Sequence, residues 1–178
     1  AADINGMSVA DSSHQTKVAL SFRNGVYYGI FTAGDQLLVT EIKMVGSRVS
    51  FLDIPLLTNL VKLEFIDCKY LTKLDLTPNT SLTTIMISNA RLKDHFTLPT
   101  TYNSLTHLSL VNCDLTGLLN LSIGTAAANI EKIDLEDNNL TELRVDMDTD
   151  YASLITLNLR NNLFDVDAFN EMFSDGSG

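Results

Sequence analysis

Apolar residues recur in one frame along residues 39–164. In each copy, three apolar positions spaced three and two residues apart lead to a small residue, and a further apolar residue follows two positions later. Copies begin at Leu60, Leu82, Leu105, Ile130 and Leu154, and a weaker copy begins at Val39. Their starting points lie 21, 22, 23, 25 and 24 residues apart. This nearly constant period predicts a protein built from stacked repeats.

The small position of the frame is occupied by side chains of different chemistry: Ser47, Cys68, Ala90, Cys113, Asn138 and Asn162. This frame resembles the leucine-rich repeat template L-x-x-L-x-L-x-x-N/C-x-L, whose period is 20–29 residues. The stretch LTKLDLTPNTSLTTI (71–85) further resembles the surface leucine-rich repeat proteins of anaerobic gut bacteria. The resemblance implies a right-handed solenoid of about six coils with a parallel, concave sheet along one side.

In this arrangement the small position follows a strand, where the chain turns and leaves backbone N–H and C=O groups facing the interior. Such groups need partners, which an asparagine amide supplies well and a buried thiol only weakly. Ala90 supplies none, so we expect a looser coil there, or one satisfied by water or by Asn89. Cys68 and Cys113 lie two coils apart, about 9–10 Å at the usual strand spacing, which is too far for a disulfide. We therefore predict two free, buried and inert thiols.

Short alternating segments separate the copies, at 52–54, 74–76, 96–98, 119–121 and 143–145. A period of two indicates extended chain rather than helix, and turn residues such as those of TPNTS (77–81) follow the segments. The predicted class is therefore mostly β, an α/β-type solenoid with extended segments on its convex side.

The two ends of a solenoid need covers. KVALSF, RNG and VYYGIF (17–31) predict a β-hairpin, because Asn-Gly favours the tight turn, so we assign 17–38 to an N-terminal cap. Residues 1–16 are small and polar, and we interpret them as a flexible tail. In 165–178, apolar residues recur at helical spacing after Asp165, which predicts a short helical cap and tail.

The chain has 178 residues, a net charge of −10 and two cysteines. Its acidity argues against a nucleic-acid partner, and no apolar run reaches the roughly 20 residues of a membrane-spanning helix. The three histidines are scattered, and DMDTD (146–150) lacks the glycine and glutamate of a calcium loop. No catalytic or cofactor-binding motif occurs. We expect no enzyme, no cofactor and no metal site. Asn-x-Ser/Thr triplets begin at Asn79, Asn120 and Asn139.

The outward positions of the ladder strands form three columns across the predicted sheet. The columns are Glu41, Lys62, Thr84, His107, Lys132, Thr156; then Lys43, Glu64, Met86, Ser109, Asp134, Asn158; then Val45, Ile66, Ser88, Val111, Glu136, Arg160. Opposite charges that neighbour each other are explained by cross-strand support. Ile66, Met86 and Val111 place apolar side chains on three consecutive coils, beside His107 and within a rim of charged residues. This arrangement fits either ordinary scatter of apolar residues over the surface or a partner-binding site. The candidate partner-binding residues are Ile66, Met86, His107, Val111, Glu136 and Arg160.

These observations favour a non-catalytic module that binds another macromolecule, a protein of the host or of the producing cell, through the concave face. The family resemblance implies a secreted or cell-surface bacterial protein, with a leader, ordinary or lipid-anchoring, outside this sequence, and we expect a monomer. One alternative is a structural spacer or stalk. A glycan-binding module is disfavoured, since the chain has no Trp and no aromatic residue at the outward ladder positions.

Overall fold

The computed structural model describes residues 2–4, 7–11, 18–23, 26–31, 39–54, 57–99, 101, 104–121, 129–144 and 153–167. These residues are almost entirely strand and turn. The strands are β1 (Ala2–Ile4), β2 (Met7–Asp11), β3 (Val18–Arg23), β4 (Val26–Phe31), β5 (Val39–Val45), β6 (Val49–Asp53), β7 (Lys62–Ile66), β8 (Lys73–Asp75), β9 (Thr84–Ser88), β10 (Phe96–Thr97), β11 (His107–Val111), β12 (Thr116–Asn120), β13 (Lys132–Asp134), β14 (Asn139–Arg144) and β15 (Thr156–Asn158).

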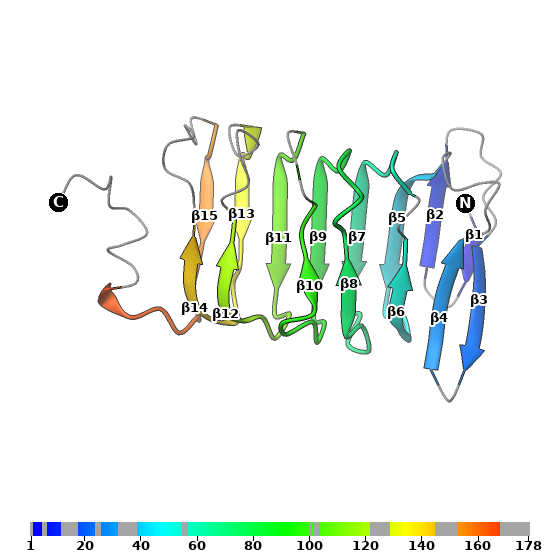
Figure 1. Ribbon diagram of the computed structural model, residues 1–178, viewed down its shortest axis with the longest axis horizontal. Helices are drawn as coiled ribbons and strands as arrows, with labels where there is room; N and C mark the ends of the chain where they lie inside the picture. Colours follow the sequence, from blue (N-terminus) through cyan, green and yellow to red (C-terminus); the bar gives the residue numbers. More distant parts are fainter. Residues whose placement is uncertain are drawn as a thin grey trace.

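One strand of every repeat copy joins a single sheet, which we call the ladder sheet. Its order is β1-β2-β5-β7-β9-β11-β13-β15, and the strands from β5 onward are parallel (Figure 1). The register follows the repeat frame, so that Ile85 of β9 faces both Leu63 of β7 and Leu108 of β11. Burial alternates along these strands, with Leu63 and Phe65 of β7 fully buried and their neighbours partly exposed. The outward columns read from the sequence are therefore those of the structure.

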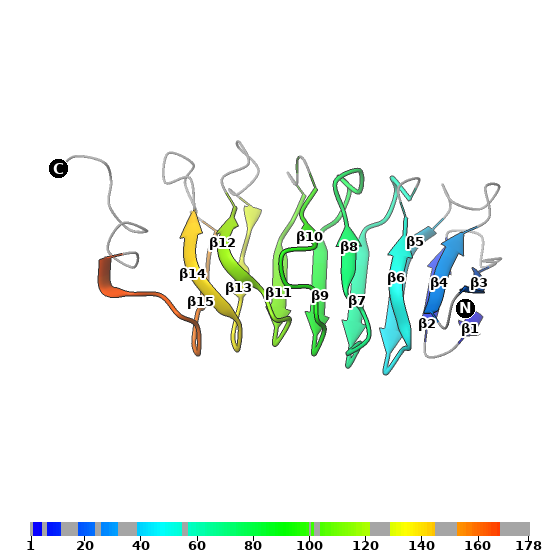
Figure 2. The same cartoon turned by 60° about the horizontal axis from the view of Figure 1, so that its bottom comes forward.

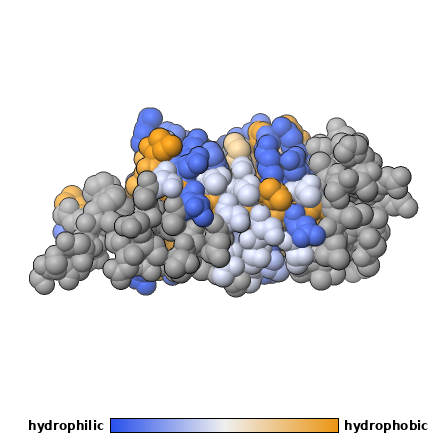
Figure 3. All heavy atoms as spheres, turned by 90° about the horizontal axis from the view of Figure 1, so that it is seen from above, coloured by the Kyte–Doolittle hydropathy of each residue, from blue (hydrophilic) through white to orange (hydrophobic). Residues whose placement is uncertain are grey.

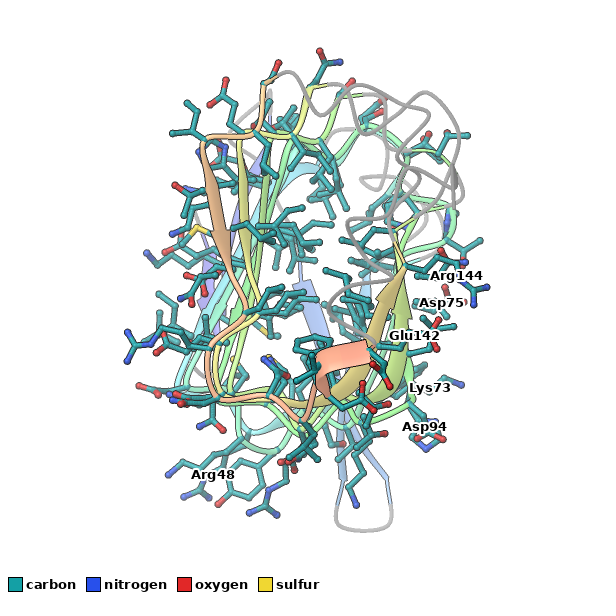
Figure 4. All side chains as sticks on the ribbon, turned by 90° about the vertical axis from the view of Figure 1, so that its left-hand side faces the viewer. Arg48, Lys73, Asp75, Asp94, Glu142 and Arg144 are labelled. Atoms are coloured by element: carbon teal, nitrogen blue, oxygen red, sulfur yellow. The ribbon has the colours of Figure 1, made fainter. Side chains whose placement is uncertain are left out.

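The return strands form a second layer. β6, β8 and β10 lie in one sheet with β3 and β4, and β12 pairs with β14 in another. Viewed along the stack, the apolar side chains fill the space between the two layers (Figure 4). The molecule is thus a mostly β solenoid of stacked parallel strands, of which the described residues cover about four turns. Seen from two directions, the stack runs straight, with little curvature (Figures 1 and 2). We therefore call the outer side of the ladder sheet the ladder face.

The front of the stack differs from the sequence interpretation. The predicted hairpin is present as β3 and β4, and β4 continues the return layer by pairing in parallel with β6. The segment interpreted as a flexible tail, 1–16, instead contains β1 and β2, and β2 pairs antiparallel with β5 at the edge of the ladder sheet. Edge strands gain hydrogen bonds when another strand covers them, which favours this pairing. The sequence signal was Asn5-Gly6, a two-residue hairpin turn signal between the two strands.

The rear of the stack is described only in part. Val166 and Asp167 have helical backbone, and the remainder of the predicted cap, 168–178, lies outside the described residues. Leu157 and Leu159 of the last copy are only partly buried, in contrast to the equivalent residues of earlier copies. The C-terminal helix therefore remains a prediction.

One residue of the repeat frame lies elsewhere than the pattern implies. Tyr70 was read as an interior position of the second copy, but its side chain is 52% exposed and Leu71 is fully buried instead. The backbone N–H of Leu71 donates to the carbonyl of Cys68 at 2.8 Å, forming a tight turn that carries Tyr70 outward.

The opposite corner, which precedes the ladder strands, is rich in threonine, serine and proline, as in residues 77–84. Figure 3 looks onto this corner and shows a pale, weakly polar central area. In the part of the chain that the structure describes, no helix is long and apolar enough to cross a membrane.

Candidate functional site

Two asparagines of the small position bind the backbone of adjacent coils. Asn138 accepts hydrogen bonds from the N–H groups of Cys113 and Leu115 at 3.0 and 3.1 Å, and its amide donates to the carbonyls of Leu110, Leu135 and Glu136. Asn162 is placed in the same way, accepting from the N–H of Leu140 at 3.1 Å and donating to three carbonyls. Each amide thus joins its own turn to the preceding coil.

The cysteines perform the same task more weakly, since their thiols lie 3.8 and 3.5 Å from the carbonyls of Met44 and Ile87 on the preceding coils, whereas Ser47 bonds within its own turn. The thiol of Cys68 lies 3.5 Å from the carbonyl of Ile66, and that of Cys113 lies 3.4 Å from the carbonyl of Val111. Both thiols are free and buried. Ser47 is also buried, and its hydroxyl accepts a hydrogen bond from the N–H of Val49. Burial raises the pKa of Cys68 to about 11 and that of Cys113 to about 12, so both stay protonated.

Ala90, which cannot bond through its side chain, is tied to the next coil by its backbone, whose N–H donates to the carbonyl of Asn112 at 3.2 Å. Asn89 does not turn inward to replace it. The Asn89 amide instead donates to Asp67, and Asn112 donates to Asn89 at 2.8 Å, along the outside of the turn. The expected rescue by Asn89 is therefore not what the structure contains.

A second row, immediately before the small position, was missed in the sequence. Its members all have a positive φ, between 51° and 59°: Gly46, Asp67, Asn89, Asn112, Asp137 and Asn161. This left-handed conformation is open to Gly and is tolerated best by Asn and Asp among the other residues. The signal was the restriction of this position to Gly, Asp and Asn in all six copies. This row fixes the sharp exit of the chain from each ladder strand.

A third asparagine, Asn79, is fully buried at the opposite corner. Its amide donates to the carbonyls of Ile54 and Leu57 at 3.1 and 2.9 Å, and its side-chain oxygen has no hydrogen-bond partner. A glycan on Asn79 is incompatible with this burial, so this triplet is structural. Asn120 and Asn139, which begin the other two triplets, are exposed.

The candidate partner-binding residues lie on the ladder face, but their apolar members are not one unbroken strip. Val111 faces Ser88 across the strands, and the continuing register places Ile66 on the other side of Ser88. Met86, which is 39% exposed, lies diagonally between Ile66 and Val111 and faces Ser109. His107 faces Thr84 and Lys132. The structure thus brings together a small apolar patch interrupted by serines.

Charged networks lie on the two sides of this patch. Glu64 accepts from Lys43 at 2.8 Å and lies 3.1 Å from Lys62. Lys62 thus pairs with Glu64 of its own strand and not with Glu41, its oppositely charged neighbour in the outward column. The hydrogen bond from Lys43, together with Lys62, lowers the pKa of Glu64, although burial opposes the shift. On the other side, Arg160 lies 3.6 Å from Glu136.

Asn158 completes the second network by donating to both Asp134 and Glu136 at 3.0 Å. Lys132 lies 3.5 Å from Asp134. The contacts of Asn158 and Arg160 join neighbouring coils, whereas Lys132 and Asp134 lie on the same strand. The contacts between coils support the sheet, and the whole network rims the patch with charge.

The described part of the chain has no group of three His, Cys, Asp or Glu side chains that could hold a metal ion. On the return side, Asp75 accepts from Thr77 and Thr97, and these bonds, the Thr77 side chain first, lower its pKa. Figure 4, which looks along the stack, shows Lys73, Asp75, Glu142 and Arg144 on the outer side of the return strands, with Lys73 and Asp75 on β8 and Glu142 and Arg144 on β14. The Asp75 carboxylate thus joins two coils, because Thr77 lies on its own coil and Thr97 lies on the next one.

No protein-family model matches the chain, and comparison with curated proteins gives no match. The repeat interpretation therefore rests on the period of the sequence, on the register of the ladder strands and on the hydrogen bonds of the small position. Function has to be argued from the surfaces themselves.

Proposed function

We propose that this chain is a non-catalytic protein-recognition module that binds its partner through the ladder face. The observation that carries the proposal is the patch of Ile66, Met86 and Val111, flanked by His107 and rimmed by the Glu136–Arg160 pair. Protein interfaces combine a small apolar centre with a polar rim, and extended solenoid faces are common binding surfaces. Met86 adds a flexible, polarisable side chain of the kind enriched at such interfaces.

The finer family assignment belongs to the same proposal. The repeat template supports a right-handed leucine-rich repeat solenoid of about six coils with a C-terminal helical cap. By analogy with the surface proteins that the sequence resembles, we place the protein outside a bacterial cell, secreted or at the cell surface, and monomeric. Fold-level analogy alone carries the location.

The proposal is tested by binding to surface-protein fractions of host cells and of the producing cell. Wild type is compared with Met86→Lys/Val111→Lys, which places two charges in the patch. The matched control is Val61→Lys/Leu118→Lys, because both side chains are exposed and apolar (38% and 43%) but neither belongs to the outward columns of the ladder strands. All three proteins are first checked for equal urea unfolding.

We expect a partner that the wild type and the control retain and the patch variant loses. That partner is then purified and titrated, and the patch variant should bind at least tenfold more weakly, since a charge buried in an interface is costly. Equal binding by the patch variant would contradict recognition through this face. The straight stack would then favour the spacer role.

A further inference from the structure

The basic side chains of this acidic protein fall into two groups. All of its 12 lysines and arginines except Lys17 and Arg23 have described side chains. Six of these ten have partners: Lys43, Lys62, Lys132, Arg144 and Arg160 lie in ion pairs, and Lys73 lies 5.7 Å from the ring centre of Phe51. Arg48, Lys69, Arg91 and Lys93 form no ion pair within the described residues, and all four are exposed.

Three of these cations lie at one corner of the solenoid, where the chain leaves the ladder strands. Arg48, Lys69 and Arg91 each follow the small position directly, on three consecutive coils. Equivalent residues of adjacent coils are about 4.8 Å apart along the stack. Figure 2 turns this corner forward, and Figure 4 shows Arg48 pointing away from the stack at this corner. Like charges stacked in register are unfavourable for the fold, so stability does not explain the row.

Two members of the row, Lys69 and Arg91, line a hollow of about 330 Å³. Its lining is polar and of mixed charge: Asp67, Lys69, Asn89, Ala90, Arg91, Asn112 and Asp114. Asp67 and Asn89 are joined in the amide row described above, so their side chains are already oriented. Next to Lys69 stands Tyr70, half exposed and off the ladder face. The corner therefore combines cations, fixed polar groups and an aromatic ring.

We propose that this corner binds an anionic saccharide, one that carries carboxylate or sulfate groups on a hydroxyl-rich chain. Arginine forms paired hydrogen bonds with carboxylates and related oxyanions, and lysine adds a point charge. The carboxylates of Asp67 and Asp114 accept hydrogen bonds from the hydroxyl groups of a saccharide, which the side chains of an acidic peptide do not offer. The Tyr70 ring offers an apolar face to the sugar ring. This site is separate from the ladder face and does not depend on the proposed function.

The experiment titrates the protein by calorimetry with four probes: a sulfated oligosaccharide, a carboxylated oligosaccharide of galacturonate, a neutral oligosaccharide of equal length, and oligoglutamate. Wild type is compared with Arg48→Gln/Lys69→Gln/Arg91→Gln. The control, Lys43→Gln/Lys73→Gln/Arg144→Gln, removes the same charge elsewhere, and Glu64 keeps Lys62 in that control. A further variant, Tyr70→Ala, tests the ring.

We expect the wild type and the control to bind at least one of the two charged saccharides, and the corner variant to lose at least about tenfold for each cation removed. Tyr70→Ala should weaken saccharide binding several-fold. The proposal is overturned if neither charged saccharide binds, if the control loses as much as the corner variant, or if oligoglutamate binds as tightly as the saccharides. The patch variant Met86→Lys/Val111→Lys should give unchanged saccharide titrations even where it loses its protein partner. Failure of this site and failure of the proposed function are therefore distinguishable.

Discussion

The hydrogen bonds of Asn138 allow the cost of removing one turn-forming amide to be worked out. In Asn138→Ala, the N–H groups of Cys113 and Leu115 lose their acceptor in the interior. The carbonyls of Leu135 and Glu136 keep other donors, the Asn162 amide and the Asn112 N–H respectively. The cost therefore falls mainly on two buried donors, each worth about 1–3 kcal/mol when left unsatisfied, and the carbonyl of Leu110 also loses the amide as a donor.

We therefore expect Asn138→Ala to lower the free energy of unfolding by about 2–5 kcal/mol. The matched control is Asn139→Ala, one residue further along and exposed, which should stay within about 0.5 kcal/mol of wild type. Urea unfolding at equal m-values gives both numbers. Hydrogen exchange should accelerate most at the amides of Cys113 and Leu115. Equal stability of the two variants would refute the assignment of Asn138 as the bridge between coils.

Three further outcomes follow from the structure. Asn79→Asp should cost more than about 3 kcal/mol in urea unfolding, because it buries a charge and removes the donor to two carbonyls, whereas the exposed Asn120→Asp should be nearly neutral. Asn112→Val should cost about 1–2 kcal/mol at its positive φ, and Asn112→Gly should not; equal costs would contradict the left-handed turn. The pKa values of Cys68 and Cys113 are raised above the ordinary 9.0, so the contribution of the buried thiols to stability is complete below about pH 9 and is lost as the pH rises toward 11 and 12. The urea midpoint of the wild type should therefore fall across this pH range, and that of Cys68→Ala/Cys113→Ala should fall less.

The period of the sequence was sufficient to predict the ladder strands, their register and the extended return segments. Each coil has to bury the same set of apolar positions, so the register of one copy is constrained by the copies beside it. Leu63, Ile85 and Leu108 lie side by side and are all buried, and a shift of one strand by one residue would expose its member of this set. Tyr70 was misplaced because a single local turn shifts one copy by one residue. A frame that accepts any apolar residue does not detect that shift.

Features outside the repeat were harder to predict. The strands β1 and β2 have only three and five residues, and the turn signal Asn5-Gly6 points only to the pairing of β1 with β2. The pairing of β2 with β5 depends on the open edge of β5, which that signal does not reveal. The corner hollow was missed for a different reason. Arg48, Lys69 and Arg91 are ordinary surface cations when read one at a time, and their lack of partners becomes visible only when every ion pair is known.

Because β2 pairs antiparallel with β5, further coils can be added to the ladder sheet behind β5 but not in front of it. Behind the front strands, each coil accepts another parallel coil of similar length in the same register. A gene duplication that inserts one whole unit between β5 and β15 would lengthen the rod by about 4.8 Å and leave the front untouched. The same insertion ahead of β5 would break the reversed pairing. The number of coils, and with it the length of the rod, can thus change in evolution behind β5, whereas the antiparallel strands in front of β5 have to stay as they are.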